Sequence, residues 1–389
     1  MSRAWGRWRL RRELSVLFRR FSYAVFMWPA ERGINWLYDA FWNRLVSIEK
    51  EIDKKKASRV AVYLVYQPLG LSNITFLTIE ALRLAGYSVL IVSNAKLRLD
   101  DASRLSAKVA AILVRPNYGV DFGGYRDGVL HLWKYKKSID EILFLNDSVF
   151  CLCGNLEKFF SKIKNSPEDV ISAVELQGGQ SANAVLTSYF ITFRRDALKS
   201  WLFWEFWRSY RMANSRYVTV RRGERALSRM VKSSSFSSRG MVSADTSMVS
   251  IIDAMSIEDL RQVVRYCALT DESFFLLIER SLDCSKEHVR EDQRSFLSRF
   301  VLTVARRRSP VASFPYLAHV ILEMPVQKKG STLLQRLALC RVADGINDGV
   351  VTDLDPVMLY EVSKLRNLYL MDKDTSSIYM RLVRAARAI

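Results

Sequence analysis

Cysteine and histidine are scarce in this sequence of 389 residues, which holds five cysteines and three histidines. An odd number of cysteines scattered along a long chain does not make a disulfide framework. Cys151 and Cys153 form a Cys-x-Cys pair. No second pair matches it and the histidines are scattered, so the spacing argues against a structural zinc site. We therefore expect a protein of the reducing cytosol.

Long apolar runs are also missing. The apolar run at residues 24–30 is too short to span a bilayer, since a spanning helix needs about 20 apolar residues. The same region lacks the continuous apolar core and small-residue cleavage site of a signal peptide. We expect neither a transmembrane helix nor a signal peptide in this region.

Acidic residues are few relative to basic ones. The chain has 59 lysines and arginines against 40 aspartates and glutamates, a formal charge of +19. Such a charge implies an anionic partner, which can be nucleic acid, an anionic membrane or a phosphate-bearing substrate. The hydrophobic share of 49% is that of an ordinary globular protein. The length suggests about two domains.

The first 47 residues are rich in arginine and aromatic residues, and five of the nine tryptophans lie there. A basic amphipathic segment with aromatic anchors is typical of a helix that lies in a membrane interface. We predict that residues 1–58 are a membrane-surface arm and linker, with the charged stretch 48–58 as the domain boundary. Packing of the arm on its own domain, or a dimer contact, stays open. Nucleic acid is not the expected partner, because no motif of that class accompanies the charge.

From residue 59 onward, short β-branched runs alternate with helical patterns. Repeated strand–helix–strand units predict an α/β fold, a parallel sheet with helices on both faces. The ends of three strands carry Tyr66-Gln67, Ser93-Asn94 and Arg115 to Asn117. Their convergence at one sheet edge predicts a nucleotide pocket. The expected strands cover 60–65, 88–92, 110–114, 142–145, 170–174 and 185–193, and the expected helices 72–85, 124–135, 156–163, 195–210, 245–269, 271–280, 287–306 and 331–343.

Two polar clusters flank one expected helix and strand. The second cluster, Asn146-Asp147-Ser148, directly follows a buried strand, where open α/β sheets bind ligands. An aspartate there can hold a divalent cation, which in turn can hold phosphate oxygens. Either cluster alone is more typical of turn and capping residues, but the two together favour a site. The first cluster contains Asn117, Asp121, Gly123, Gly124, Tyr125 and Arg126.

The motif pair carries a resemblance. Arg115-Pro-Asn-Tyr-Gly-Val-Asp-Phe-Gly-Gly-Tyr, followed by Leu143-Phe-Leu-Asn-Asp-Ser, resembles the rhamnan-synthesis F family of bacterial glycosyltransferases, over roughly residues 59–329. The resemblance implies a GT-A-like nucleotide-sugar domain at 59–330, before a helical C-terminal region at 331–389. It also implies a peripheral enzyme on the cytoplasmic face of the bacterial inner membrane. Its product would be a cell-surface polysaccharide or lipopolysaccharide.

The resemblance also suggests roles for single residues. Asp147, with Asp121, would hold a divalent cation (magnesium or manganese) on the donor diphosphate. Glu224 is the candidate general base, because a carboxylate near the acceptor can take the proton of the attacking hydroxyl; Asp245 is the second candidate. Arg221, Arg222 and Arg225 would face a phosphate or be solvated. The expected substrate-binding residues are Tyr66, Gln67, Asn94, Arg115, Asn117, Asp121, Gly123, Gly124, Tyr125, Asn146, Ser148 and Tyr189.

The sequence departs from the family in two places. Glu175-Leu-Gln-Gly-Gly stands where family members commonly have a segment with aspartate, tryptophan and glycine. Asn146-Asp147-Ser148 differs from the usual Asp-x-Asp pattern, so arginines in place of a metal are an alternative. The expected donor is a nucleotide diphosphate sugar, rhamnose or another deoxyhexose, transferred with inversion to a glycan. The alternative function is a non-catalytic glycan-binding or scaffold protein of an assembly complex.

Overall fold

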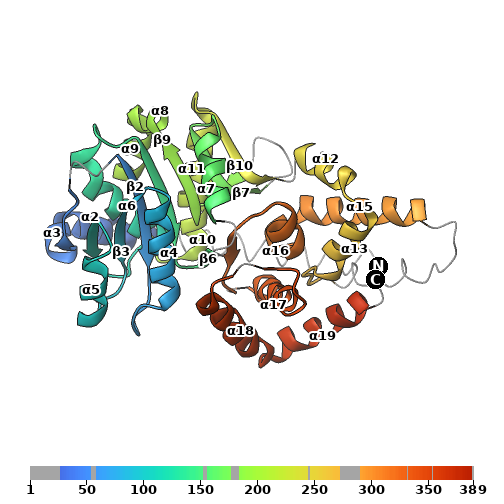
Figure 1. Cartoon of the computed structure of the whole chain (residues 1–389). Coiled ribbons are helices and arrows are strands. Elements are labelled where there is room, and N and C mark those ends of the chain that lie inside the picture. The colour runs from blue at the N-terminus through green and yellow to red at the C-terminus, as the bar shows by residue number, and fades with distance from the viewer. Residues whose placement is uncertain are drawn as a thin grey trace.

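The computed structural model describes residues 27–53, 58–151, 156–176, 184–243, 246–271, 290–330, 332–352 and 354–387. An α/β lobe built on a sheet lies beside a mainly helical lobe (Figure 1). The strands are β1 (Ser47–Lys50), β2 (Arg59–Val65), β3 (Ser88–Ser93), β4 (Ala111–Val114), β5 (Glu141–Asn146), β6 (Val149–Cys151), β7 (Val170–Leu176), β8 (Val185–Leu186), β9 (Phe190–Arg194), β10 (Ser238–Ser243) and β11 (Val326–Lys328).

The helices of the α/β lobe come from the first two thirds of the chain, and those of the helical lobe follow β10. The first group is α2 (Trp28–Ala40), α3 (Trp42–Leu45), α4 (Asn73–Leu84), α5 (Leu99–Ser106), α6 (Val120–Leu132), η3 (Trp133–Tyr135), α7 (Leu156–Asn165), α8 (Arg195–Lys199), α9 (Trp201–Ser209), α10 (Arg216–Thr219), η6 (Val220–Glu224) and α11 (Arg225–Ser233). The second group is α12 (Thr246–Ala254), α13 (Ile257–Arg265), α15 (Arg290–Arg307), α16 (Pro310–Ser313), η8 (Leu317–Ile321), α17 (Leu333–Asn347), α18 (Pro356–Leu370) and α19 (Lys373–Arg387).

Within the described residues, nine strands form the central sheet, in the order β1-β4-β3-β2-β5-β9-β7-β10 with β8 beside β7. Strands β4, β3, β2 and β5 are mutually parallel, β10 is parallel to β7, and β9 runs antiparallel between β5 and β7. The predicted α/β class is therefore present, with a mixed sheet in place of a fully parallel one. The order β4-β3-β2-β5 puts a topological switch point between β2 and β5, where such sheets bind ligands.

Strand β2 shows how the sheet separates two apolar layers. Val60, Val62 and Leu64 face the cluster that includes residues of α6 and α9. Ala61, Tyr63 and Val65 face a second cluster that includes residues of α4, α7 and the helical lobe. Because successive side chains of a strand point to opposite faces, a continuous apolar run fills both layers.

Glycine allows α6 to lie close against the sheet. A Cβ atom on Gly124 would lie 2.2 Å from Cδ1 of Leu64, and one on Gly128 would lie 2.8 Å from Cγ1 of Val62. The close approach of the α6 backbone is thus directed at β2. Their spacing of four residues puts both on the face of α6 that meets the strand.

Some expected elements differ from the observed ones. Residues 47–50, expected at the arm–connector boundary, form β1 and pair antiparallel with β4. The serine-rich stretch 232–240 continues into β10, which pairs with β7. Both strands are recruited by backbone hydrogen bonds along a sheet edge, and neither has a clear apolar alternation. The expected strand 185–193 is two strands, β8 and β9, with Thr187-Ser188-Tyr189 between them.

Two long expected helices are each divided by a serine. Ser200, in extended conformation, caps α9 by accepting a hydrogen bond from the backbone N–H of Leu202. Ser256 caps α13 in the same way through the N–H of Asp259. Serine oxygens satisfy the orphan N–H groups at a helix start, so each serine stabilises a new helix. The expected helix 124–135 begins earlier, at Val120, and the expected helix 271–280 lies largely outside the described residues.

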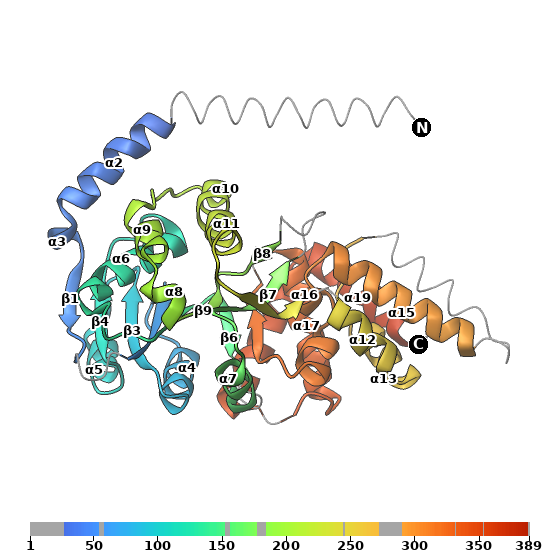
Figure 2. The ribbon, with the colours of Figure 1, turned by 90° about the horizontal axis from the view of Figure 1, so that it is seen from above.

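Helix α2 packs on the α/β lobe (Figure 2). The side chain of Asn35 exchanges hydrogen bonds of 2.9 and 2.8 Å with the backbone of Met212. Tyr38 donates to Asp127 of α6 at 2.6 Å. For residues 28–46 the structure therefore shows the alternative left open above, an arm that packs on its own domain. Within the described part of the chain, no helix has the length and apolar character needed to cross a membrane.

The short ladder between β6 and β11 joins the two lobes. β6 follows the end of β5 by two residues and pairs antiparallel with β11, with Lys328 opposite Val149. The N–H of Lys329 donates to the carbonyl of Ser148 at 2.8 Å. Lys328 and Lys329 lie far from β5 in the sequence, and this pairing brings them to the end of β5.

Candidate functional site

Asp147 lies at the switch point of the sheet. Its N–H donates to the carbonyl of Leu64 at 3.0 Å, which ties the end of β5 to the end of β2. Its Oδ2 accepts hydrogen bonds of 2.9 Å from the N–H of Tyr66 and from Nε2 of Gln67. Three residues that the sequence assigned to the site thus meet at one point, and the strand order explains why.

Asn146 links Asp147 to the first cluster. Its Nδ2 donates to Oδ2 of Asp121 at 2.9 Å, and its Oδ1 accepts from the hydroxyl of Ser148 at 2.5 Å. Asp121 stands in the first turn of α6, whose N-terminus carries partial positive charge. Asp121 therefore lies close enough to Asp147 for the Asp147 carboxylate to affect its pKa.

The pKa of Asp121 reflects this crowding. Burial raises the pKa of Asp121 to about 6, Lys328 opposes the rise, and the carboxylates of Asp147 and Glu224 add to it. A carboxyl group whose pKa is displaced by burial and by like charges is typical of a functional site. The turn before it is also strained, because Val120 has φ of 53°. A β-branched residue in this region costs energy that functional sites often bear.

Glu224 approaches the same site from another element. It ends the π-helical turn η6 and leads into α11, so a continuous helical path runs through Glu224. The hydroxyl of Ser188 donates to its Oε1 at 2.8 Å. The carbonyl of Ser188 accepts from the hydroxyl of Tyr125 at 3.1 Å. The break between β8 and β9 thus positions the candidate base.

Two lysines of the β11 end complete the cluster. Burial lowers the pKa of Lys328, against the opposing effects of Glu224 and Asp121. Burial likewise lowers the pKa of Lys329, against the opposing effect of Asp147. The Lys328 ammonium lies 4.7 Å from the ring centroid of Tyr189, which is buried beneath it. The site therefore combines three carboxylates with two partly desolvated ammonium groups.

The sequence did not assign these lysines to the site. The Lys328-Lys329 pair is visible in the sequence, but nothing beside it marks a site. Their position depends on β11 crossing back to β6, a pairing over more than 170 residues of chain. Local patterns do not encode such a pairing.

Arg115 was predicted to bind substrate, and its surroundings contradict this. Its side chain has no exposed surface and forms a 2.5 Å ion pair with Asp127, which is equally enclosed. It also donates to Oδ1 of Asn94 at 2.7 Å and to the carbonyl of Tyr118 at 2.5 Å. These bonds use its guanidinium within the protein, so Arg115 fixes the strand ends and the turn before α6.

The other residues that the sequence predicted to bind substrate differ in burial and in contacts. Asn94 is buried and donates to Oδ1 of the exposed Asn117 at 3.2 Å. Gly123 and Gly124 are buried; a Cβ on Gly123 would lie 2.3 Å from the carbonyl oxygen of Tyr118, so both serve close packing and do not line a ligand surface. Tyr66 is half exposed. Asp245 lies outside the described residues.

The aromatic helix α9 belongs to the core. Trp204 and Trp207 are 3% and 0% exposed, so neither ring is accessible to stack on a sugar. Trp207 stacks on Phe122 of α6 with ring centroids 5.6 Å apart. The stripe at helical spacing is thus a packing surface, the commoner meaning of such a pattern.

The described residues contain no group of three or more histidine, cysteine, aspartate or glutamate side chains suited to a metal ion. Asp147 and Asp121 are two carboxylates joined through Asn146. Magnesium is commonly held by one or two carboxylates together with substrate phosphates. The donor set therefore fits a cation shared with a bound diphosphate and does not fit an all-protein metal cage.

Comparisons with known proteins place this geometry in context. An uncharacterized protein, y4gN of Sinorhizobium fredii (strain NBRC 101917 / NGR234), is 29% identical over 214 residues, which are 55% of this chain and 56% of the relative. The match therefore spans about half the length of the relative. The crystal structure of S. aureus TarS 1-349 aligns over 85% of this chain and 91% of that chain, with 12% identity and a TM-score of 0.27. A likeness that slight bears on neither fold nor function.

The family model described as rhamnan synthesis protein F matches residues 89–255. That span includes both polar clusters and Glu224. The resemblance that the sequence suggested is thereby confirmed: over residues 89–255 this chain matches the rhamnan synthesis protein F family.

Proposed function

We propose that this protein is a glycosyltransferase with a GT-A-like fold, which moves a sugar from a nucleotide diphosphate donor to a growing polysaccharide or lipopolysaccharide. The observation that carries the proposal is the meeting of Asp147, Asp121, Glu224, Lys328 and Lys329 at the switch point of the sheet. The family match supports the same activity.

The two lysines supply positive charge for the donor. In transfer, the bond between the anomeric carbon and the diphosphate breaks, and the diphosphate keeps the electron pair. Lys328 and Lys329 are fixed by β11 and face that developing charge from a partly desolvated position. Preorganised charge of this kind stabilises the transition state more than solvent does, because it needs no reorganisation.

Glu224 acts as the general base. The acceptor hydroxyl attacks the anomeric carbon as its proton passes to the Glu224 carboxylate, which Ser188 orients through its hydrogen bond. Attack from the side opposite the diphosphate inverts the anomeric centre. We propose rhamnose or another deoxyhexose as the transferred sugar, on the basis of the family match.

A cation bound between Asp147, Asp121 and the diphosphate would add Lewis-acid charge to the leaving group. Because two lysines already lie there, we propose that the cation adds to transfer without being essential to donor binding. With excess EDTA, we expect slower transfer and retained donor binding, measured by product formation and by calorimetry. Loss of donor binding in EDTA would contradict this division between cation and lysines.

Glu224→Gln tests the mechanism directly. The amide keeps the shape and the hydrogen bond from Ser188 but cannot take a proton. We expect kcat to fall about 10²–10⁴-fold with little change in donor affinity, measured by single-turnover transfer. Glu205→Gln, on the outer surface of α9, is the matched control and keeps wild-type turnover. Turnover undiminished in Glu224→Gln would remove Glu224 as the base.

A further inference from the structure

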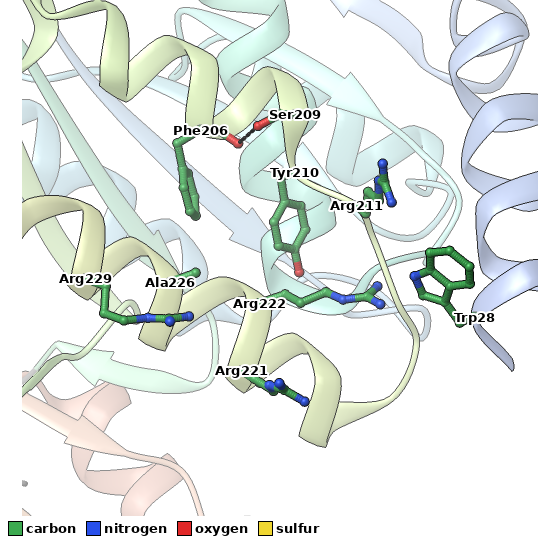
Figure 3. A pocket seen from close by; sticks show the side chains of 9 residues that line it. All are labelled: Trp28, Phe206, Ser209, Tyr210, Arg211, Arg221, Arg222, Ala226 and Arg229. Atoms are coloured by element: carbon green, nitrogen blue, oxygen red, sulfur yellow. Dashed lines mark hydrogen bonds between the residues drawn. The ribbon is translucent and has the colours of Figure 1, made fainter. Parts of the chain in front are cut away.

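A cavity lies between α2, the end of α9 and η6–α11 (Figure 3). It measures about 350 Å³. Four arginines project around it from two segments, and Trp28 of α2 stands across from them. The residues that line it are Trp28, Phe206, Ser209, Tyr210, Arg211, Arg221, Arg222, Ala226 and Arg229.

The cavity lies on a different face of the helix from the catalytic cluster. Arg222, Ala226 and Arg229 recur at i, i+4 and i+7 and so share one face of the η6–α11 segment. Glu224 points the other way, toward Ser188. A group bound among the arginines is therefore outside the donor site.

The arginines carry charge that the protein leaves largely uncompensated. Arg222 pairs with Glu31 of α2 at 3.1 Å, which anchors the arm. In the described part of the chain, no ion pair involves Arg211, Arg221 or Arg229. Guanidinium groups gathered in this way match the geometry of phosphate oxygens, which they bind in a bidentate manner.

Helix α2, whose Trp28 lines this cavity, presents an apolar face away from its docked side. Its docked side is polar, with Glu31, Asn35 and Tyr38 buried at i, i+4 and i+7. Its outer side is apolar, and Ile34, Leu37 and Phe41 are 48%, 48% and 44% exposed. Trp36 is 69% exposed on the same outer side. An exposed apolar face on a helix marks a contact surface.

We propose that the arginine cavity binds the phosphate of an anionic lipid headgroup while the outer face of α2 lies in the membrane interface. Charge complementarity favours this occupant, because four arginines, an aromatic rim and a chain of +19 suit an anionic bilayer. The sequence predicted membrane contact for the whole arm at residues 1–58. This proposal assigns the contact to α2 and the arginine cavity. A second copy of the chain, or a soluble phosphate compound, is the competing occupant that the test must separate.

The test is flotation of the full chain with vesicles of phosphatidylglycerol and phosphatidylethanolamine, and with neutral phosphatidylcholine vesicles. One variant carries Arg221→Gln and Arg229→Gln, and a second carries Ile34→Ser and Leu37→Ser. The control, Lys136→Gln with Lys137→Gln, removes the same charge from another basic cavity beside Trp201. Thermal melts establish that each variant folds.

We expect the wild type to float with anionic vesicles only. The arginine variant should lose roughly fivefold in partitioning per arginine removed, the apolar variant should also lose partitioning, and the control should change by less than about twofold. Equal losses in the arginine variant and the control would show diffuse charge and overturn the proposal. So would an unchanged arginine variant, or equal binding to neutral vesicles.

Two further readouts separate the competing occupants. If millimolar glycerol phosphate displaces the wild type from vesicles and binds it alone with comparable affinity, the ligand is a soluble phosphate and the lipid proposal fails. If gel filtration shows a dimer that Ile34→Ser with Leu37→Ser dissolves, the outer face of α2 is a subunit contact and the proposal fails. Nucleotide-sugar binding, measured in the same variants, stays at the wild-type value and keeps this outcome distinct from the proposed transferase activity.

Discussion

Asp121 has a strongly raised pKa within the candidate site. It lies among two other carboxylates, yet one of its partners is the neutral amide of Asn146. Burial and like charges raise its pKa to about 6. The folded protein therefore holds the Asp121 proton more tightly than the unfolded chain does, and ionised Asp121 lowers stability at neutral pH.

The raised pKa predicts how stability changes in Asp121→Asn. Below about pH 3 the carboxyl is protonated in both states, so the variant and the wild type should be equally stable. As the pH rises through about 6, the folded wild type must ionise Asp121, and the variant escapes that cost. Since the pKa of Asp121 is raised by about two units, we expect the variant at pH 8 to unfold with a free energy about 3 kcal/mol higher, measured by urea denaturation at both pH values. A variant less stable than the wild type at pH 8 would contradict the burial of charge at this position.

The sequence located some residues of the site but could not distinguish a substrate-binding residue from a structural one. Asp121 follows from the polar cluster that precedes and opens α6. Asn146 and Asp147 follow from position alone, because a polar residue at the end of a buried parallel strand lies at the binding edge. Arg115 fits the same rule, yet its partner Asp127 lies twelve residues ahead on α6 and encloses it. A buried partner on another element cannot be read from local pattern, so the sequence could not tell a substrate ligand from a structural ion pair.

Helix α6 places the first cluster, and its contact with β2 depends on glycine. We predict that Gly124→Ala destabilises the protein by about 1–3 kcal/mol, because the added methyl would lie 2.2 Å from Cδ1 of Leu64. Gly33→Ala is the matched control, since nothing lies within 4 Å of its Cβ position in α2. That substitution should be neutral or stabilise the protein, because alanine favours a helix. Thermal and urea unfolding of both variants measure the difference; equal effects would refute the close packing.

At the scale of elements, the apolar strands were predictable and the edges were not. The strands β2, β3, β4 and β5 are buried on both faces of the sheet. They therefore appear in the sequence as continuous apolar runs, which predict buried strands. β1 and β10 lack such a run and exist through pairing with a neighbour. The serines that divide α8 from α9, and α12 from α13, are visible in the sequence, but the apolar content around them suggested continuous helices.

At the scale of the whole molecule, the site is assembled from both lobes. The sheet supplies the carboxylates, and β11 returns from the helical lobe to supply Lys328 and Lys329. Helices α17 to α19 share an apolar cluster with α13, α15 and one face of the sheet, which holds the lobes together. The two lysines reach β5 only through the pairing of β11 with β6. Donor binding therefore tests whether the carboxylates of the sheet and the lysines of β11 form one site.

The most direct measurement is thermal unfolding of the wild type with a panel of nucleotide sugars. We predict that at least one donor raises the melting temperature, since a ligand present at 100 times its Kd stabilises a protein by about 2.7 kcal/mol. Lys328→Gln should lose most of that shift, and Lys364→Gln, an exposed lysine of α18, should keep it. Stabilisation by no donor, or an equal shift in Lys328→Gln, would contradict the proposed nucleotide-sugar site.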